Sequence, residues 1–181
     1  RRGTLQGILE YLSELSVSGV WAGRDLTAMR RASIQAMGKK LECELKSDLK
    51  SLAELSGGIE SLLRGAGVSP SIYNDVLIAV DEIFSNIMIH AYKNDPRGSI
   101  RIAAMLSGKK FEITFSDDGE KFEPGEDKPR LGKALLTEDY PGLGLFITRN
   151  LMDEFHYEHV NGENRTRLVK IISRAGEESR S

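Results

Sequence analysis

Three polar residues of different chemistry recur at every fourth position of one predicted helix. Glu82, Asn86 and His90 follow each other at i, i+4 spacing, so they form one line along the helix surface. The line borders an apolar face that includes Ile83 and Ile87. A carboxylate can act as a general base, and an amide oxygen is a suitable ligand for a hard divalent metal. Taken alone, the pattern is more typical of an exposed polar stripe than of a binding site.

An acidic pair follows the second of two predicted strands. Asp117-Asp118-Gly119 comes directly after a stretch, residues 110–116, in which apolar residues alternate with polar ones. A carboxylate at a strand end beside a glycine is well placed to accept a hydrogen bond from a ligand at the sheet edge. Asp-Gly is also one of the commonest turn dipeptides, so this pair alone indicates little.

A third segment, Pro141-Gly142-Leu143-Gly144-Leu145-Phe146-Ile147, places two glycines before a predicted apolar helix. Backbone N–H groups at a helix N-terminus can bind phosphate. The segment is not the dinucleotide-binding fingerprint, because Ile147 stands at the third glycine position and no buried strand precedes it. The chain also lacks a Gly-Lys-Ser/Thr phosphate loop.

The remaining reactive side chains indicate no site. His156 and His159 lie in a predicted strand, where their spacing sends them to opposite faces and disfavours a shared metal. Cys43 is the only cysteine, which excludes an internal disulfide and fits a reducing compartment. We find no serine, histidine and aspartate signature of nucleophilic catalysis.

The elements that must position these residues are a mixture of strands and helices. Strands are predicted near 41–45, 99–106, 110–116, 154–160 and 166–172, and helices near 48–64, 69–92 and 142–152. Ser69-Pro70 is a good start for the long helix that carries Glu82. Hairpins at both ends exclude a purely parallel, doubly wound sheet. We therefore predict an α+β fold, a two-layer α/β sandwich with a mixed, mostly antiparallel sheet and helices on one face.

The chain divides into three parts. Residues 1–37 have helix-compatible apolar spacing but carry no motif, and we interpret them as an N-terminal helical segment or linker. Residues 38–173 form one mixed domain, and residues 174–181 are a polar tail. Because the first residue is Arg1 rather than Met, we expect a fragment of a longer protein.

Composition excludes several classes of function. The 181 residues are 40% hydrophobic and 29% charged, with a formal net charge of −2. A protein that coats nucleic acid needs a strong basic excess, which this chain lacks. No apolar run approaches the ~18 residues of a membrane span, and no signal peptide opens the chain. We expect a cytoplasmic protein with no direct contact to nucleic acid or membrane.

Taken in order, the segments resemble the GHKL, or Bergerat-fold, ATP-binding superfamily. The pattern comprises E-x-x-x-N-x-x-x-H from Glu82, D-D-G from Asp117, P-G-L-G-L-F-I from Pro141 and N-x-T-x-L-x-K from Asn164. It covers about residues 38–173. Within the superfamily, the chain is most similar to bacterial anti-sigma-factor serine/threonine-protein kinases of partner-switching systems.

The resemblance implies a role for particular side chains. Asn86 matches the ligand of Mg²⁺ between the nucleotide phosphates, and Glu82 matches the general base that takes a proton from an acceptor hydroxyl. Asp117 matches the aspartate that accepts a hydrogen bond from the adenine amino group. The nucleotide-binding positions that it implies are Asn86, His90, Asp117, Gly119, Gly142, Leu143, Gly144 and Thr166.

Two positions depart from the pattern. Lys121 stands where the superfamily often has a second glycine, although the serine-kinase branch commonly lacks it too. Asn164-Arg165 occupy the place where a glycine commonly precedes the final threonine motif. The residues between Glu120 and Tyr140 match the loop that covers ATP.

The function implied is an ATP- and Mg²⁺-dependent kinase that phosphorylates a small anti-sigma-factor antagonist protein, binds a sigma factor and forms a homodimer. Two alternatives stay open: a non-catalytic ATP-binding interaction module, and the kinase module of a larger phosphatase or sensor regulator. The catalytic domain of a sensor histidine kinase fits less well. The histidines are His90, His156 and His159, so residues 1–37 contain no phosphoacceptor.

Overall fold

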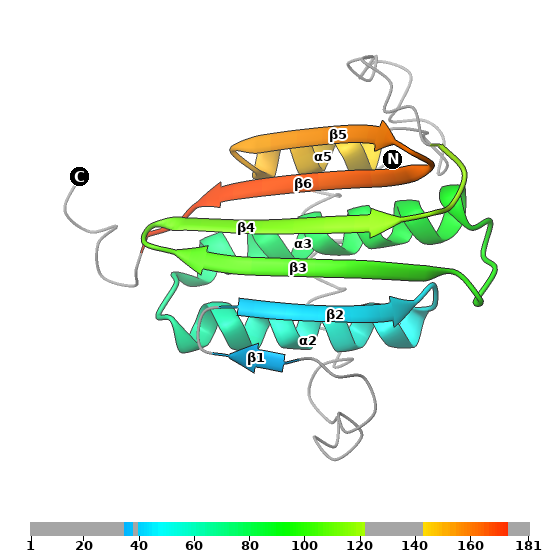
Figure 1. Ribbon diagram of the computed structural model, residues 1–181. Coiled ribbons are helices and arrows are strands. Elements are labelled where there is room, and N and C mark those ends of the chain that lie inside the picture. The colour runs from blue at the N-terminus through cyan, green and yellow to red at the C-terminus, as the bar shows by residue number, and fades with distance from the viewer. Residues whose placement is uncertain (1–34, 38–39, 122–142, 174–181) are drawn as a thin grey trace, which may run out of the picture.

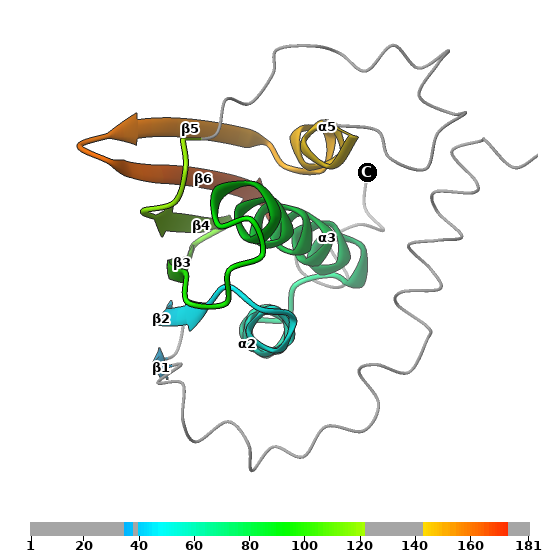
Figure 2. The ribbon, with the colours of Figure 1, turned by 90° about the vertical axis from the view of Figure 1, so that its right-hand side faces the viewer.

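One antiparallel sheet carries helices on one of its faces in the computed structural model, which describes residues 35–37, 40–121 and 143–173 (Figures 1 and 2). The predicted α+β sandwich is confirmed. In chain order the elements are β1 (Gln35–Met37), β2 (Lys40–Lys46), α2 (Leu49–Gly65), α3 (Pro70–Asn86), the π-helical turn η2 (Ile87–Ala91), β3 (Ser99–Ser107), β4 (Lys110–Asp117), α5 (Leu143–Leu151), β5 (Glu154–Val160) and β6 (Glu163–Ile171).

The strands lie in the order β1-β2-β3-β4-β6-β5, and every pairing among the described residues is antiparallel. The last strand, β6, is therefore inserted between β4 and β5. It begins at Glu163, three residues before the predicted start, because Asn161 and Gly162 alone make the turn. Both turn residues have positive φ, 54° and 80°, as a two-residue hairpin turn with Asn-Gly requires.

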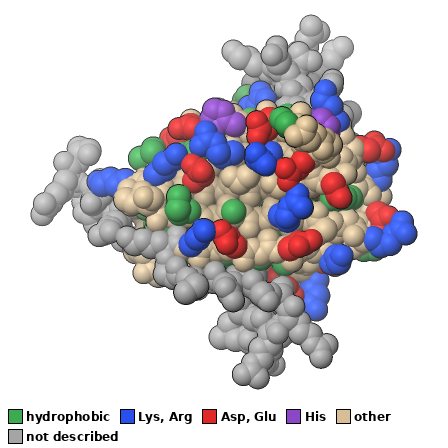
Figure 3. Space-filling model, viewed as in Figure 1, with side chains coloured by type: hydrophobic (Ala, Val, Ile, Leu, Met, Phe, Trp, Pro, Cys, Tyr) green, Lys and Arg blue, Asp and Glu red, His purple; other side chains and the backbone are tan. Residues whose placement is uncertain are grey.

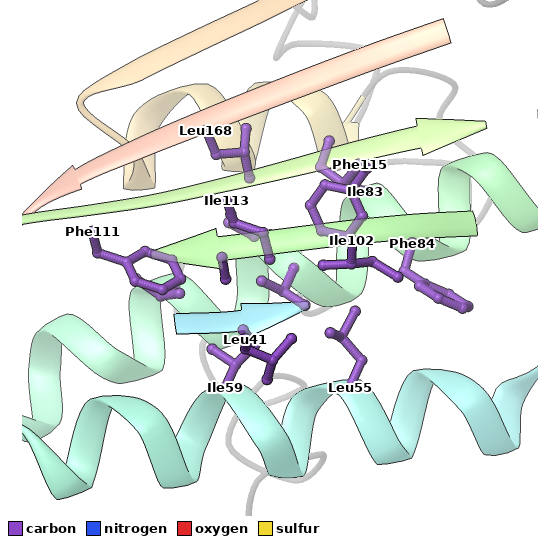
Figure 4. Packing of buried hydrophobic residues seen from close by; sticks show 14 of the residues in the cluster. Leu41, Leu55, Ile59, Ile83, Phe84, Ile102, Phe111, Ile113, Phe115 and Leu168 are labelled. Atoms are coloured by element: carbon purple, nitrogen blue, oxygen red, sulfur yellow. The ribbon is translucent and has the colours of Figure 1, made fainter. Parts of the chain in front are cut away.

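The hydrophobic core fills the space between the sheet and the helices (Figure 4). The two-residue period of a strand decides which side chains enter it: in β3 the buried residues alternate with exposed ones from Ile100 to Leu106. The largest fully buried side chains are Phe84, Phe111, Phe115, Leu41, Leu55, Ile59, Leu63, Ile100, Ile113, Leu168, Val76 and Val80. Each contributes roughly 1.5–3 kcal/mol through burial of apolar surface. Through this core α3 packs against the sheet.

The long predicted helix ends differently from expectation. Its start is as predicted, with Pro70 at the first helical position, but the Ser69 hydroxyl makes no capping bond to the helix backbone. Its final turn is a π-helix, in which the Tyr92 N–H donates to the Ile87 carbonyl at 3.0 Å. The wider turn brings Ala91 to the chain after β4, where the Glu120 N–H donates to the Ala91 carbonyl at 2.9 Å. Such π turns occur frequently at functional sites.

The N-terminal edge of the sheet corrects the predicted division of the chain. Residues 35–37 belong to the segment 1–37 that we interpreted as helical, but they form strand β1, which pairs with β2. The unsatisfied backbone groups of an edge strand explain the difference, because they bind an extended segment better than a helix. The rest of that segment and the tail 174–181 lie outside the described residues.

The face of the sheet opposite the helices carries interspersed acidic and basic side chains (Figure 3). Arg165 pairs with Glu158 and Glu163, and Arg167 pairs with Glu112 and Glu154. Exposed pairs of this kind contribute at most about 1 kcal/mol each. Among the described helices, none is long and apolar enough to cross a membrane.

A buried hydroxyl on α5 gives a prediction about stability. Thr148 is fully buried, and its Oγ1 has no hydrogen-bond partner among the described residues. An unsatisfied buried hydroxyl costs about 1–3 kcal/mol, and valine has the same shape without it. We therefore expect Thr148→Val to raise the free energy of unfolding in urea by about 1 kcal/mol. The matched control is Thr114→Val on the open face; a loss of stability in Thr148→Val would contradict the prediction.

Candidate nucleotide-binding site

A pocket lies where α3, η2 and α5 meet the ends of β4, β5 and β6. It is lined by Ile83, Asn86, Ile87, Ala91, Asp117, Leu145, Phe155, Tyr157, Asn164 and Thr166. The wall is mostly apolar with a few polar groups, which is the usual character of a small-molecule site. Three of the residues singled out in the sequence, Asn86, Asp117 and Thr166, lie in this wall.

Asp117 lies at the end of β4 with only 3% of its surface exposed. Its Oδ1 accepts hydrogen bonds from the Gly119 N–H at 3.0 Å and from Asn164 Nδ2 at 2.8 Å. Burial raises the pKa of Asp117, and these two hydrogen bonds act in the opposite direction. Both bonds from the described residues are accepted by Oδ1, so Oδ2 is available to accept one from a ligand.

Gly119 is required by a close approach between two parts of the backbone. A Cβ at this position would lie 2.7 Å from the Ala91 Cβ and 2.8 Å from the Ala91 carbonyl oxygen. Neither atom is at the end of a movable side chain, so a larger residue would separate η2 from the end of β4. The predicted Asp-Gly pair is therefore more than a turn, because it joins the helix to the sheet beside the pocket.

The start of α5 lies close to the side chains of Glu82 and Asn86 on α3. A Cβ on Gly144 would lie 2.0 Å from Glu82 Oε2 and 3.8 Å from Asn86 Nδ2. Two motifs about sixty residues apart are thus brought into contact. Burial raises the pKa of Glu82, and the neighbouring Asp81 raises it further. A half-buried carboxylate with a raised pKa beside a pocket is a candidate general base.

The Asn86 side chain has the chemistry of a metal ligand. Its Nδ2 is buried and has no hydrogen-bond partner among the described residues. The two ends of a side-chain amide are nearly isosteric, so the group can present either its nitrogen or its oxygen to a bound species. Mg²⁺ keeps several waters and needs few protein oxygens when phosphates supply the others. This unsatisfied amide in the pocket wall therefore fits a magnesium–nucleotide complex.

The other predicted positions have different outcomes. Thr166 is 8% exposed and faces the pocket from β6. His90 is exposed on η2 and is not among the residues that line the pocket, so its predicted role stays a prediction. Leu143 is the first residue of α5, whereas Gly142 and the predicted covering loop from residue 122 onward lie outside the described residues.

Two polar residues of the wall, Tyr157 and Asn164, were not predicted as site residues. Tyr157 donates its hydroxyl to Asn164 Oδ1 at 2.7 Å, and Asn164 in turn bonds Asp117. In the sequence Asn164 opens the N-x-T-x-L-x-K motif and departs from a glycine pattern, but neither observation assigns it a role in the site. The signal that identifies it is positional: it is a polar residue at an inward-facing position of β6, directly opposite Asp117 of β4.

Comparison with known proteins identifies the family of this domain. A family model described as "Histidine kinase-like ATPase domain" matches residues 45–170. A serine-protein kinase RsbW of Listeria monocytogenes serotype 4a is 32% identical over 119 residues, which cover 63% of this chain and 74% of the relative. An anti-sigma F factor of Anoxybacillus flavithermus is 29% identical over 110 residues, covering 56% and 70%.

A solved structure has the same fold. The crystal structure of the RsbU and RsbW domains of Rv1364c from Mycobacterium tuberculosis matches with a TM-score of 0.56 and 21% identity. The match covers 75% of this chain and 33% of that one, so our chain spans about a third of its length. With the family match over residues 45–170, these findings establish the family: the chain belongs to the histidine kinase-like ATPase domains.

Proposed function

We propose that the protein is an ATP- and Mg²⁺-dependent protein serine/threonine kinase of the anti-sigma-factor type. Its acceptor is a small antagonist protein, and it also binds the sigma factor that this antagonist releases. The names of the relatives, serine-protein kinase RsbW and anti-sigma F factor, support this choice within the family.

One observation carries the proposal: the two acids of the site, Glu82 on α3 and Asp117 at the end of β4, lie beside different points along the same helix. Asp117 lies beside Gly119, which contacts Ala91 at the end of η2. Glu82 lies nine residues before Ala91, which corresponds to roughly 13 Å along the helix axis. It is in contact with the start of α5. Asn86 stands between these two points. A base-binding end and a phosphate end are therefore separated along the helix, as an extended nucleotide requires.

Each group has a defined task in this proposal. Asp117 accepts a hydrogen bond from the amino group of adenine, while N–H groups at the start of α5 bind phosphate oxygens. Asn86 holds Mg²⁺, which neutralises phosphate charge when bound. Glu82 takes the proton from the attacking serine hydroxyl; because burial raises its pKa, it is a stronger base than an exposed glutamate. Positioning and charge neutralisation are most of what phosphoryl transfer needs.

The test is transfer of label from ATP to protein. The chain is incubated with γ-labelled ATP, Mg²⁺ and each small antagonist protein encoded near its gene, and the label is located by mass spectrometry. We expect label on one serine or threonine of one antagonist, and none when Mg²⁺ is chelated. Tight ATP binding without transfer to any candidate would contradict the kinase and favour the non-catalytic interaction module.

Gly144→Ala tests the contact between α5 and α3. The added Cβ would displace the Glu82 carboxylate, which is the movable end of a side chain, so the fold should persist. We expect phosphoryl transfer to fall by about a hundredfold, the typical effect of misplacing a catalytic group, while the urea midpoint changes little. Gly57→Ala in α2, where a Cβ meets nothing within 4 Å, is the matched control. Undiminished transfer in Gly144→Ala would refute the role of this contact.

A further inference from the structure

Asn164 is the most fully bonded side chain in the pocket wall. It is 2% exposed on β6. Its Nδ2 donates to Asp117 Oδ1 at 2.8 Å and to the carbonyls of Gly119 at 3.2 Å and Glu120 at 3.1 Å. Its Oδ1 accepts from the Tyr157 hydroxyl at 2.7 Å and lies 2.8 Å from His159 Nδ1.

These partners leave the amide a single orientation. A carboxylate and two carbonyls can only accept, so they must face the NH₂ group of Asn164. The amide oxygen is then directed toward β5, and His159 must carry a proton on Nδ1. The side chain therefore cannot rotate or flip without breaking several buried hydrogen bonds.

The fixed amide of Asn164 determines which carboxylate oxygen of Asp117 can accept a hydrogen bond from a ligand. Asn164 and the Gly119 N–H together occupy Oδ1, so the carboxylate plane is set and Oδ2 remains as the acceptor. A ligand that brings an N–H to this point gains a charge-assisted hydrogen bond. A ligand that brings a carbonyl oxygen meets a carboxylate held in place and unable to turn away. Adenine carries an amino group where guanine carries a carbonyl.

We propose that Asn164 is a positioning and specificity-determining residue: it holds Asp117 in the orientation that makes the pocket select adenine over guanine nucleotides. This inference rests on the proposed function, because it takes Asp117 to be the residue that reads the base. Tyr157 and His159 support it by holding the amide oxygen from the neighbouring strand.

Two substitutions show what position 164 requires. Aspartate at position 164 would direct a second carboxylate at Asp117 and at the two carbonyls. Leucine would remove the hydrogen bonds that Asn164 makes with Asp117, with both carbonyls and with the Tyr157 hydroxyl. An unsatisfied buried polar group is costly, so either change would alter the setting of Asp117.

The experiment measures ATP and GTP affinity separately by titration calorimetry in Mg²⁺, for the wild type and for Asn164→Ala. We expect the wild type to prefer ATP. In Asn164→Ala the ratio of ATP to GTP affinity should fall by about tenfold or more, because ATP loses a correctly oriented partner and GTP loses none. Asn150→Ala, the same substitution at an exposed position of α5, should keep the wild-type ratio within about twofold.

The ratio of ATP to GTP affinity separates a positioning role of Asn164 from a merely structural one. Loss of a merely structural residue would lower the affinity for both nucleotides equally. An unchanged ratio in folded Asn164→Ala, with ATP still bound by the wild type, would overturn this inference and leave the proposed function standing. Failure of the wild type to bind ATP would overturn both. If Asn164→Ala does not fold, Tyr157→Phe decides: it removes one donor to the amide oxygen, and the ratio should fall by about threefold. An unchanged ratio there would equally overturn the inference.

Discussion

Asp117→Asn should lower the affinity for ATP by at least about a hundredfold while the chain remains folded. The hydrogen bonds around position 117 give the reason. Asn164 Nδ2 and the Gly119 N–H both point at Oδ1, so the oxygen of the new amide must face them. Its NH₂ group is then forced toward the pocket. In the variant, the NH₂ group of this amide would face the amino group of adenine, so two hydrogen-bond donors would meet. In the wild type, Asp117 Oδ2 is an acceptor at the same place.

Calorimetric titration with ATP checks this result, and urea unfolding checks that the variant is folded. Asp118→Asn is the matched control, because Asp118 is the exposed neighbour and bonds the Tyr92 hydroxyl away from the pocket wall. It should change ATP affinity by less than about twofold. Wild-type affinity in Asp117→Asn would remove the basis for placing the base at this end of the pocket.

Glu82→Gln should keep ATP affinity and lose roughly a thousandfold in phosphoryl transfer, within the usual contribution of a general base. Glutamine has nearly the same shape, so the contact with Gly144 is preserved. It cannot take a proton from the acceptor hydroxyl. The two acids of the site should therefore separate experimentally: one variant loses binding and the other loses chemistry.

The pH dependence of transfer gives an independent check on Glu82. Burial, and then Asp81, hold its pKa above the ordinary value of 4.5. A base must be ionised, so transfer by the wild type should decline as pH falls through this raised pKa, and the residual transfer of Glu82→Gln should lack that decline. Glu60→Gln, on α2, is the control and should behave like the wild type. Full transfer by Glu82→Gln would exclude this residue as the base and leave the ATP-binding assignments unaffected.

Local patterns were sufficient to predict most of the elements. Alternation identified β2, β3 and β4, and Pro70 marked the start of α3, because these signals depend only on neighbouring residues. The turn between the last two strands was placed correctly, but β6 begins three residues before the predicted start. The π turn η2 was missed, because it depends on the contact between Ala91 and Gly119 rather than on its own residues.

The candidate site could be predicted in part for a similar reason. Asp117, Asn86 and Glu82 were found from their types, spacing and resemblance to a family. The role of Asn164 could not be found in this way, because its significance arises from the pairing of β4 with β6 across 47 positions of sequence. The proximity of Gly144 to Glu82 likewise follows from the packing of α5 on α3.

The place of β6 within the sheet has a consequence for how the protein is made. It is the last described strand in the chain, yet it lies between β4 and β5 and contributes Asn164 and Thr166 to the pocket. During synthesis the earlier strands are made first, and the edge of β4 that pairs with β6 stays unpaired until residues 164–171 have been added. A complete pocket wall therefore forms only after β6 has been synthesised. A product truncated before β6 would have α3 and Asp117 but would lack Asn164 and Thr166 in the pocket wall.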